Sequence, residues 1–137
     1  MAGDKQFTTS GTKLIGRTKI YELSPAGCAN FNAKKIFVGF CGNADNFGDA
    51  IHWLNNPDQK APKVKNIEML MLTNRKEFFH ATTLSNWMLI NQPFFAIGSG
   101  MQFAIAAMEA GKTPYEAVKI ASKHDPHTGM GFNKLEM

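Results

Sequence analysis

The 137-residue sequence predicts an α+β protein in which helices and strands pack as layers. Candidate strands occur in groups, several before the first long helix and several between that helix and a pair of helices near the C-terminus. They do not alternate one-to-one with helices, as the strands of a doubly wound parallel sheet do. Residues 35–42 are almost continuously apolar, which indicates a strand covered on both faces. A layered sandwich satisfies these observations.

The first half of the chain contains short extended stretches and one helix. Its predicted elements are extended stretches at 12–15 and 17–23, a turn at 24–27, and strands at 28–31 and 35–42. A helix follows, capped by Asn43 or Asp45, and residues 55–58 end it. Its apolar side chains recur at three- and four-residue steps, so they share one face: Ala44, Phe47, Ile51 and Leu54.

The middle of the chain predicts a hairpin. A strand at 67–72 is followed by a turn at 74–76 and a returning strand at 77–82, and residues 87–90 form another short extended piece. The lysines and prolines at 60–65 indicate a solvated linker before this hairpin.

The stretch from 94 to 111 organises the second half. Residues 94–97 are all apolar and predict a buried strand, followed by a tight turn at Gly98-Ser99-Gly100. Residues 101–110 predict a helix that has little polar face and is buried, and Gly111 fits a left-handed C-cap. Ser99 is either the N-cap of this helix or a functional hydroxyl, and the local pattern favours the cap.

The most clearly marked helix start is Thr113-Pro114-Tyr115-Glu116, which has threonine at the N-cap, proline at N1 and glutamate at N3. The helix is predicted to run to about Lys123. Residues 124–129 break it, and residues 131–135 add a last strand.

Composition narrows the class of protein. The net charge is +4 and the lysines are scattered, which argues against a nucleic-acid partner. Two cysteines do not make a disulfide framework, and the sequence has neither a run long enough to span a membrane nor an apolar signal region. A protein of the cytoplasm is expected, with no membrane partner.

Other chemistries find little support. His124 and His127 are separated by Pro126 and have no cysteine or glutamate ligand nearby in sequence, so no metal site is predicted. The glycines at 39 and 42 lack the spacing of a dinucleotide-binding turn, and those around Ser99 stand too close for a nucleophile elbow. No cofactor is expected.

Several short segments stand in a recognisable order: Gly3-Asp4-Lys5-Gln6, Thr18-Lys19-Ile20, Val38-Gly39-Phe40-Cys41-Gly42, Ala96-Ile97-Gly98-Ser99-Gly100, the helix start at Thr113 and Asp125-Pro126-His127-Thr128-Gly129. Together they resemble proteasome β-subunits, the bacterial HslV peptidase and small proteasome-like relatives, many of them found in phage genomes. The resemblance covers nearly the whole chain.

The resemblance implies a four-layer αββα sandwich, the N-terminal-nucleophile hydrolase fold, which assembles into rings. Its chemistry uses the amine and hydroxyl of an N-terminal threonine, and this hydroxyl needs a base and a nearby cation. Carried over by position, Lys19 is the cation and Asp4 its carboxylate partner. Ser99, Asp125 and Thr128 are expected to orient the nucleophile's amine, and a protein or peptide is the expected substrate.

The sequence departs from this family at one point, because the threonine strand that precedes the Gly-Asp segment is absent. We therefore expect residues 1–137 to form a single proteasome-like domain that lacks the first hairpin and is catalytically incomplete. Its expected role is structural or regulatory, as a phage-derived homo-oligomer in the host cytoplasm, since an uncovered sheet edge favours pairing with another chain. The alternatives are an active threonine peptidase with an upstream start, and a virion or adaptor module that reuses the fold.

Overall fold

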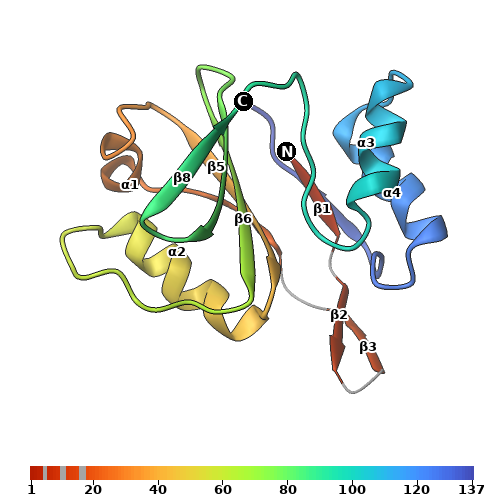
Figure 1. Cartoon of the computed structure of the whole chain (residues 1–137), viewed down its shortest axis with the longest axis horizontal. Helices are drawn as coiled ribbons and strands as arrows, with labels where there is room; N and C mark the ends of the chain where they lie inside the picture. Colours follow the sequence, from red (N-terminus) through yellow and green to blue (C-terminus); the bar gives the residue numbers. More distant parts are fainter. Residues whose placement is uncertain (5, 10–11, 16–17) are drawn as a thin grey trace.

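The computed structural model describes residues 1–4, 6–9, 12–15 and 18–137, and it has an α+β architecture of four layers (Figure 1). The larger sheet has five strands. In Figure 1, α1 and α2 lie on one side of this sheet, and β1, α3 and α4 lie on the other. The predicted αββα sandwich is therefore confirmed.

The larger sheet has the strand order β4-β5-β6-β7-β8, and every neighbouring pair is antiparallel. Its strands are β4 (Ile20–Glu22), β5 (Ile36–Gly42), β6 (Ile67–Thr73), β7 (Phe78–Thr83) and β8 (Asn86–Ile90). One face carries alternate apolar residues such as Val38, Met69 and Met71, which are fully buried. This face packs against α1 (Pro25–Ala29) and α2 (Phe47–Asn55), with the 3-10 turn η1 (Ala44–Asn46) leading into α2.

The second β layer is the antiparallel pair β1 (Ala2–Asp4) and β9 (Phe132–Lys134), which joins the two ends of the chain. The Met1 amino group donates to the Leu135 carbonyl at 2.7 Å, and the Leu135 N–H donates back to the Met1 carbonyl at 2.8 Å. A Cβ added to Gly3 would lie 3.1 Å from the Ile20 side chain, so β1 packs closely on the larger sheet.

Helices α3 (Met101–Glu109) and α4 (Pro114–His124) form the outer layer on this side. They pack through small residues, chiefly Ala104, Ala107, Ala117 and Ala121, which let the two helices approach closely. The Thr113 hydroxyl accepts from the Glu116 N–H and the Glu116 carboxylate accepts from the Thr113 N–H, so the predicted capping box is confirmed.

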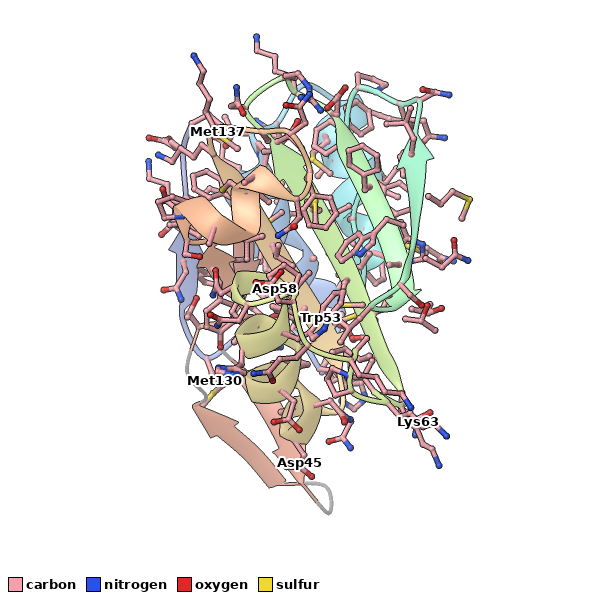
Figure 2. The ribbon with its side chains drawn as sticks, turned by 90° about the vertical axis from the view of Figure 1, so that its left-hand side faces the viewer. Asp45, Trp53, Asp58, Lys63, Met130 and Met137 are labelled. Atoms are coloured by element: carbon pink, nitrogen blue, oxygen red, sulfur yellow. The ribbon has the colours of Figure 1, made fainter. Side chains whose placement is uncertain are left out.

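A hairpin of β2 (Gln6–Thr9) and β3 (Thr12–Ile15) extends from the layers. Figure 2, turned by 90°, shows it at the end of the molecule where Asp45 and Met130 lie. Arg17, the first residue of one predicted extended stretch, lies outside the described residues.

Three sequence predictions were wrong. Residues 28–31 were expected as a strand, but α1 forms because the Ser24 hydroxyl caps it by accepting from the Gly27 N–H (3.2 Å) and Pro25 fits the first turn. Residues 94–97 were expected as a buried strand, but among the described residues they join none of the sheets. Helix α3 was expected to be buried, but its Phe103 is 42% exposed.

Candidate functional site

Lys19 is held at the start of β4 by backbone contacts to its neighbours. Its carbonyl accepts from the Phe40 N–H at 2.9 Å, which fixes it beside β5. The Thr18 hydroxyl accepts from the Ile20 N–H at 3.1 Å and donates to the Ile20 carbonyl at 2.8 Å, which closes a tight bend around Lys19. The ammonium group reaches the second β layer, where Nζ lies 3.1 Å from Asp4 Oδ1 and 3.2 Å from Asp4 Oδ2.

Asp4 is the last residue of β1 and accepts hydrogen bonds from more than Lys19. The Gln6 N–H donates to Oδ1 at 2.8 Å, and the Gly129 N–H donates to the same oxygen at 3.4 Å. The side chains of Asp4 and Lys19 are each only 15% exposed. Withdrawing two charges from water is costly, and the added backbone donors offset part of that cost at the carboxylate.

Asp125 forms a second polar cluster at the C-terminal end of α4. Its Oδ2 accepts from the hydroxyls of Ser99 and Thr128, both at 2.6 Å, and its Oδ1 accepts from the His127 N–H at 3.2 Å. The carboxylate is buried, with 6% of the residue exposed. Burial acts to raise the pKa of Asp125, but the hydrogen bonds from Ser99, Thr128 and His127 outweigh it, so the pKa lies below its ordinary value.

The cluster needs a glycine at position 100. A Cβ placed on Gly100 would lie 2.7 Å from Thr128 Oγ1, 3.2 Å from Ala121 Cβ and 3.3 Å from Asp125 Oδ2. Gly100 is also the N-cap of α3 and makes no side-chain cap, so the alternative that Ser99 caps this helix is wrong. The Ser99 hydroxyl instead donates across to α4.

The two clusters are neighbours. Gly129, which donates to Asp4, directly follows Thr128, which donates to Asp125. Gln6 reinforces this junction, because it is only 3% exposed and its side-chain amide donates to the Pro126 carbonyl at 2.7 Å. The structure thus brings together all five residues that the sequence singled out, namely Asp4, Lys19, Ser99, Asp125 and Thr128. Their roles in chemistry stay a prediction.

A cavity of about 840 Å³ is lined by residues of both β layers, of the segment 93–100 and of α3 and α4. Asp4, Lys19, Ser99 and Thr128 line it, and Asp125 lies behind them. The backbone of residues 39–42 forms another part of its wall, where the resemblance places a substrate cleft. Gly42 has φ +97° there, and a Cβ on it would lie 2.1 Å from the Asn66 carbonyl oxygen, so this turn requires glycine.

Sequence reasoning missed a polar row on the cavity-facing side of the larger sheet. Cys41, Glu68 and His80 come from β5, β6 and β7, and Glu68 accepts from the Cys41 thiol (3.2 Å) and contacts His80 Nε2 (2.9 Å). Burial, followed by the hydrogen bond to Glu68, raises the pKa of the Cys41 thiol, so it stays protonated and donates. The signal in the sequence was Glu68 itself, the lone charge in the apolar run 67–72.

The described part of the chain shows no group of three or more His, Cys, Asp or Glu side chains arranged to hold a metal ion. His124 instead stacks on Phe103, with ring centroids 5.3 Å apart. None of the helices in the described ranges has the length and apolar character that crossing a membrane requires.

The sequence matches no protein-family model, and it matches none of the curated proteins. Solved structures do match its fold. The chain is similar to BPH from Thiobacillus denitrificans, solved in complex with epoxomicin, with a TM-score of 0.64 at 16% identity over 96% of this chain and 88% of that one.

It is also similar to Anbu, an ancestral β-subunit, from Yersinia bercovieri. The TM-score is 0.66 at 12% identity, over 96% of this chain and 74% of the Anbu chain. The chain therefore has the proteasome-like α+β fold, and at these identities the likeness concerns the fold alone.

Proposed function

We propose that this protein is a self-assembling subunit of the proteasome-like type, with residues 1–137 forming one such domain. The observation that carries the proposal is the placement of the Lys19–Asp4 pair beside the Asp125 cluster, at one wall of a cavity lined by both β layers. Withdrawing an ion pair from water costs free energy that the attraction between the charges often does not repay, so such a pair at a cavity wall supports a functional site.

The chemistry of this wall suits a hydroxyl nucleophile. An ammonium group beside a hydroxyl favours its deprotonated form, and a carboxylate partner holds the ammonium in place. Lys19 and Asp4 supply these two groups. The cavity volume falls within the range of ligand sites, and peptides are the ligand class that we propose.

The described hydroxyls at this wall are poor candidates for the nucleophile itself. Those of Ser99 and Thr128 both donate to Asp125. A carboxylate with a lowered pKa is a weak base, so Asp125 orients these hydroxyls and does not activate them. We infer that the sequence printed here acts through assembly, in a structural or regulatory role, without cutting peptides.

One surface supports self-assembly. Strand β8 is an edge of the larger sheet, carries no charged residue, and exposes Met88 (60%) and Leu89 (48%). An apolar, uncharged edge strand favours pairing with another chain. Phe103 on α3 is also exposed (42%), but a single apolar side chain on the surface is ordinary and does not by itself indicate a partner.

The second candidate is an active threonine peptidase whose translation starts upstream of Met1. It is favoured by the intact Lys19–Asp4 pair, which this chemistry would need. Peptidase assays on the printed chain and on Lys19→Ala separate the candidates, together with the intact mass of the native protein. We expect no turnover from the chain of residues 1–137. Turnover that Lys19→Ala abolishes, or a heavier protein beginning with threonine, would favour the peptidase.

We further propose an HslV-like protein of phage origin that acts in the host cytoplasm. The sequence resemblance to small phage proteins supports the origin. The two free thiols, Cys28 and Cys41, support a reducing compartment.

A further inference from the structure

Cys41, Glu68 and His80 form a hydrogen-bonded row that is separate from the Lys19–Asp4 pair and from the Asp125 cluster. Cys41 and Glu68 are direct partners in the β5–β6 register, and both line the cavity. His80 stands on the next strand and holds Glu68 from the other side. The Glu68 carboxylate is thus oriented by two neighbours while its side chain is 35% exposed.

Glu68 retains the capacity to bind a further donor. An ionised carboxylate offers about four acceptor positions. The Cys41 thiol uses one on Oε2 and His80 uses one on Oε1, so each oxygen keeps a position for a ligand. A planar guanidinium, which presents parallel N–H donors, matches a carboxylate in this way better than an ammonium does.

Aromatic rings line the same cavity, and one of them lies next to His80. The Phe95 ring lies 5.9 Å from the His80 ring, and Phe78 and Phe94 line the same cavity. Guanidinium groups stack on aromatic faces and lose less hydration than ammonium groups when they do so.

The lining of the cavity is also locally acidic. Among the described side chains of the lining, three are acidic (Asp4, Asp45 and Glu68) and one is basic (Lys19). The whole protein, in contrast, has a net charge of +4. The Met1 ammonium, also at the wall, donates to the Leu135 carbonyl.

We propose that Glu68, held by Cys41 and His80 beside Phe95, forms a subsite for an arginine side chain of a peptide bound in the cavity. This proposal rests on the proposed function in so far as it takes a peptide as the ligand. It adds the preferred side chain and the residues that select it. Glu68 and Phe95 contact the guanidinium, and Cys41 and His80 are positioning residues.

The test uses three fluorescein-labelled tripeptides that differ only in the last residue: Ala-Leu-Arg, Ala-Leu-citrulline and Ala-Leu-Glu. Citrulline has nearly the shape of arginine without its charge. We expect the arginine peptide to bind the full chain about tenfold more tightly than the citrulline peptide in fluorescence anisotropy, and the glutamate peptide to bind most weakly.

The isosteric variant Glu68→Gln should reduce the arginine-to-citrulline ratio to about one. Glu22→Gln, which changes a half-exposed glutamate on β4, is the matched control and should keep the ratio. Equal binding of the arginine and citrulline peptides to the unmodified chain would overturn the proposal, even if Glu68→Gln failed to fold. Binding of none of the three peptides, or a ratio that Glu68→Gln leaves unchanged, would overturn it too.

Failure of this subsite is distinguishable from failure of the proposed function. Self-assembly is measured by sedimentation without any peptide, and the selectivity ratio is measured without reference to oligomer size. If the protein assembles but binds the arginine and citrulline peptides equally, the subsite is refuted and the proposed self-assembly is not.

Discussion

Lys19 Nζ lies 3.1 Å from Asp4 Oδ1, and this contact joins the two β layers of the molecule. Asp4 ends β1 in the smaller layer, whereas Lys19 leads into β4 of the larger sheet. Because both side chains are largely withdrawn from water, the pair fixes the spacing of the layers at the wall of the cavity. The pair is thus both part of the site and a structural connection.

A double-mutant cycle on this pair should therefore reveal strong coupling. For Lys19→Met, Asp4→Asn and the double variant, we expect a coupling free energy of about 2 kcal/mol in urea unfolding, because the contact is poorly screened by water. The pair between Lys35 and Glu22 is the control, since it is longer, 3.8 Å, and its side chains are 38% and 51% exposed. That pair should couple by about 0.5 kcal/mol or less. Equal coupling in the two cycles would contradict the structural role of Lys19 and Asp4.

Gly100→Ala should disrupt the Asp125 cluster. Its new methyl group would lie 2.7 Å from Thr128 Oγ1, so the loop after α4 must move, at a cost of about 1–3 kcal/mol in the free energy of unfolding. Gly48→Ala in α2 is the matched control, because a Cβ there meets nothing within 4 Å. It should stabilise the protein by about 0.5 kcal/mol. If Gly100→Ala left the free energy of unfolding unchanged, Thr128 and Asp125 would not be packed against Gly100 as described.

The lowered pKa of Asp125 makes its contribution to stability dependent on pH. The ionised form is favoured by folding, so the contribution is complete above the ordinary value of 3.8 and is lost as the pH falls through the lower pKa of the folded state. Asp125→Asn should cost roughly 2 kcal/mol at about pH 6, and the difference from the unmodified chain should shrink toward about pH 3.

Urea unfolding at several pH values measures this difference, and Asp58→Asn, an exposed aspartate after α2, serves as the control. A difference for Asp125→Asn that stays constant, or grows as the pH falls, would show that the carboxylate is not stabilised in its ionised form.

Much of the fold was predictable from local signals. The capping box at Thr113 and Glu116 marks a helix start whatever surrounds it. The apolar run that became β5 indicates a covered strand, and the apolar steps in α2 identify its buried face, including Phe47 and Leu54.

The errors concern properties that depend on neighbours in space. Residues 94–97 are as apolar as a strand, but a strand needs a backbone partner, and these residues line the cavity instead. The exposed Phe103 likewise shows that an apolar helix need not be buried in one chain. The row of Cys41, Glu68 and His80 could not be predicted from the sequence for the same reason. These three side chains become neighbours only through the register in which β5, β6 and β7 pair.

Sedimentation velocity at micromolar concentration tests the central claim, self-assembly of a proteasome-like subunit, most directly. We expect the unmodified chain to sediment as a species several times heavier than the 15.1 kDa monomer. Met88→Lys on the β8 edge should shift it toward the monomer, whereas Met137→Lys, at another exposed methionine, should not. A single 15.1 kDa species for the unmodified chain would contradict the account.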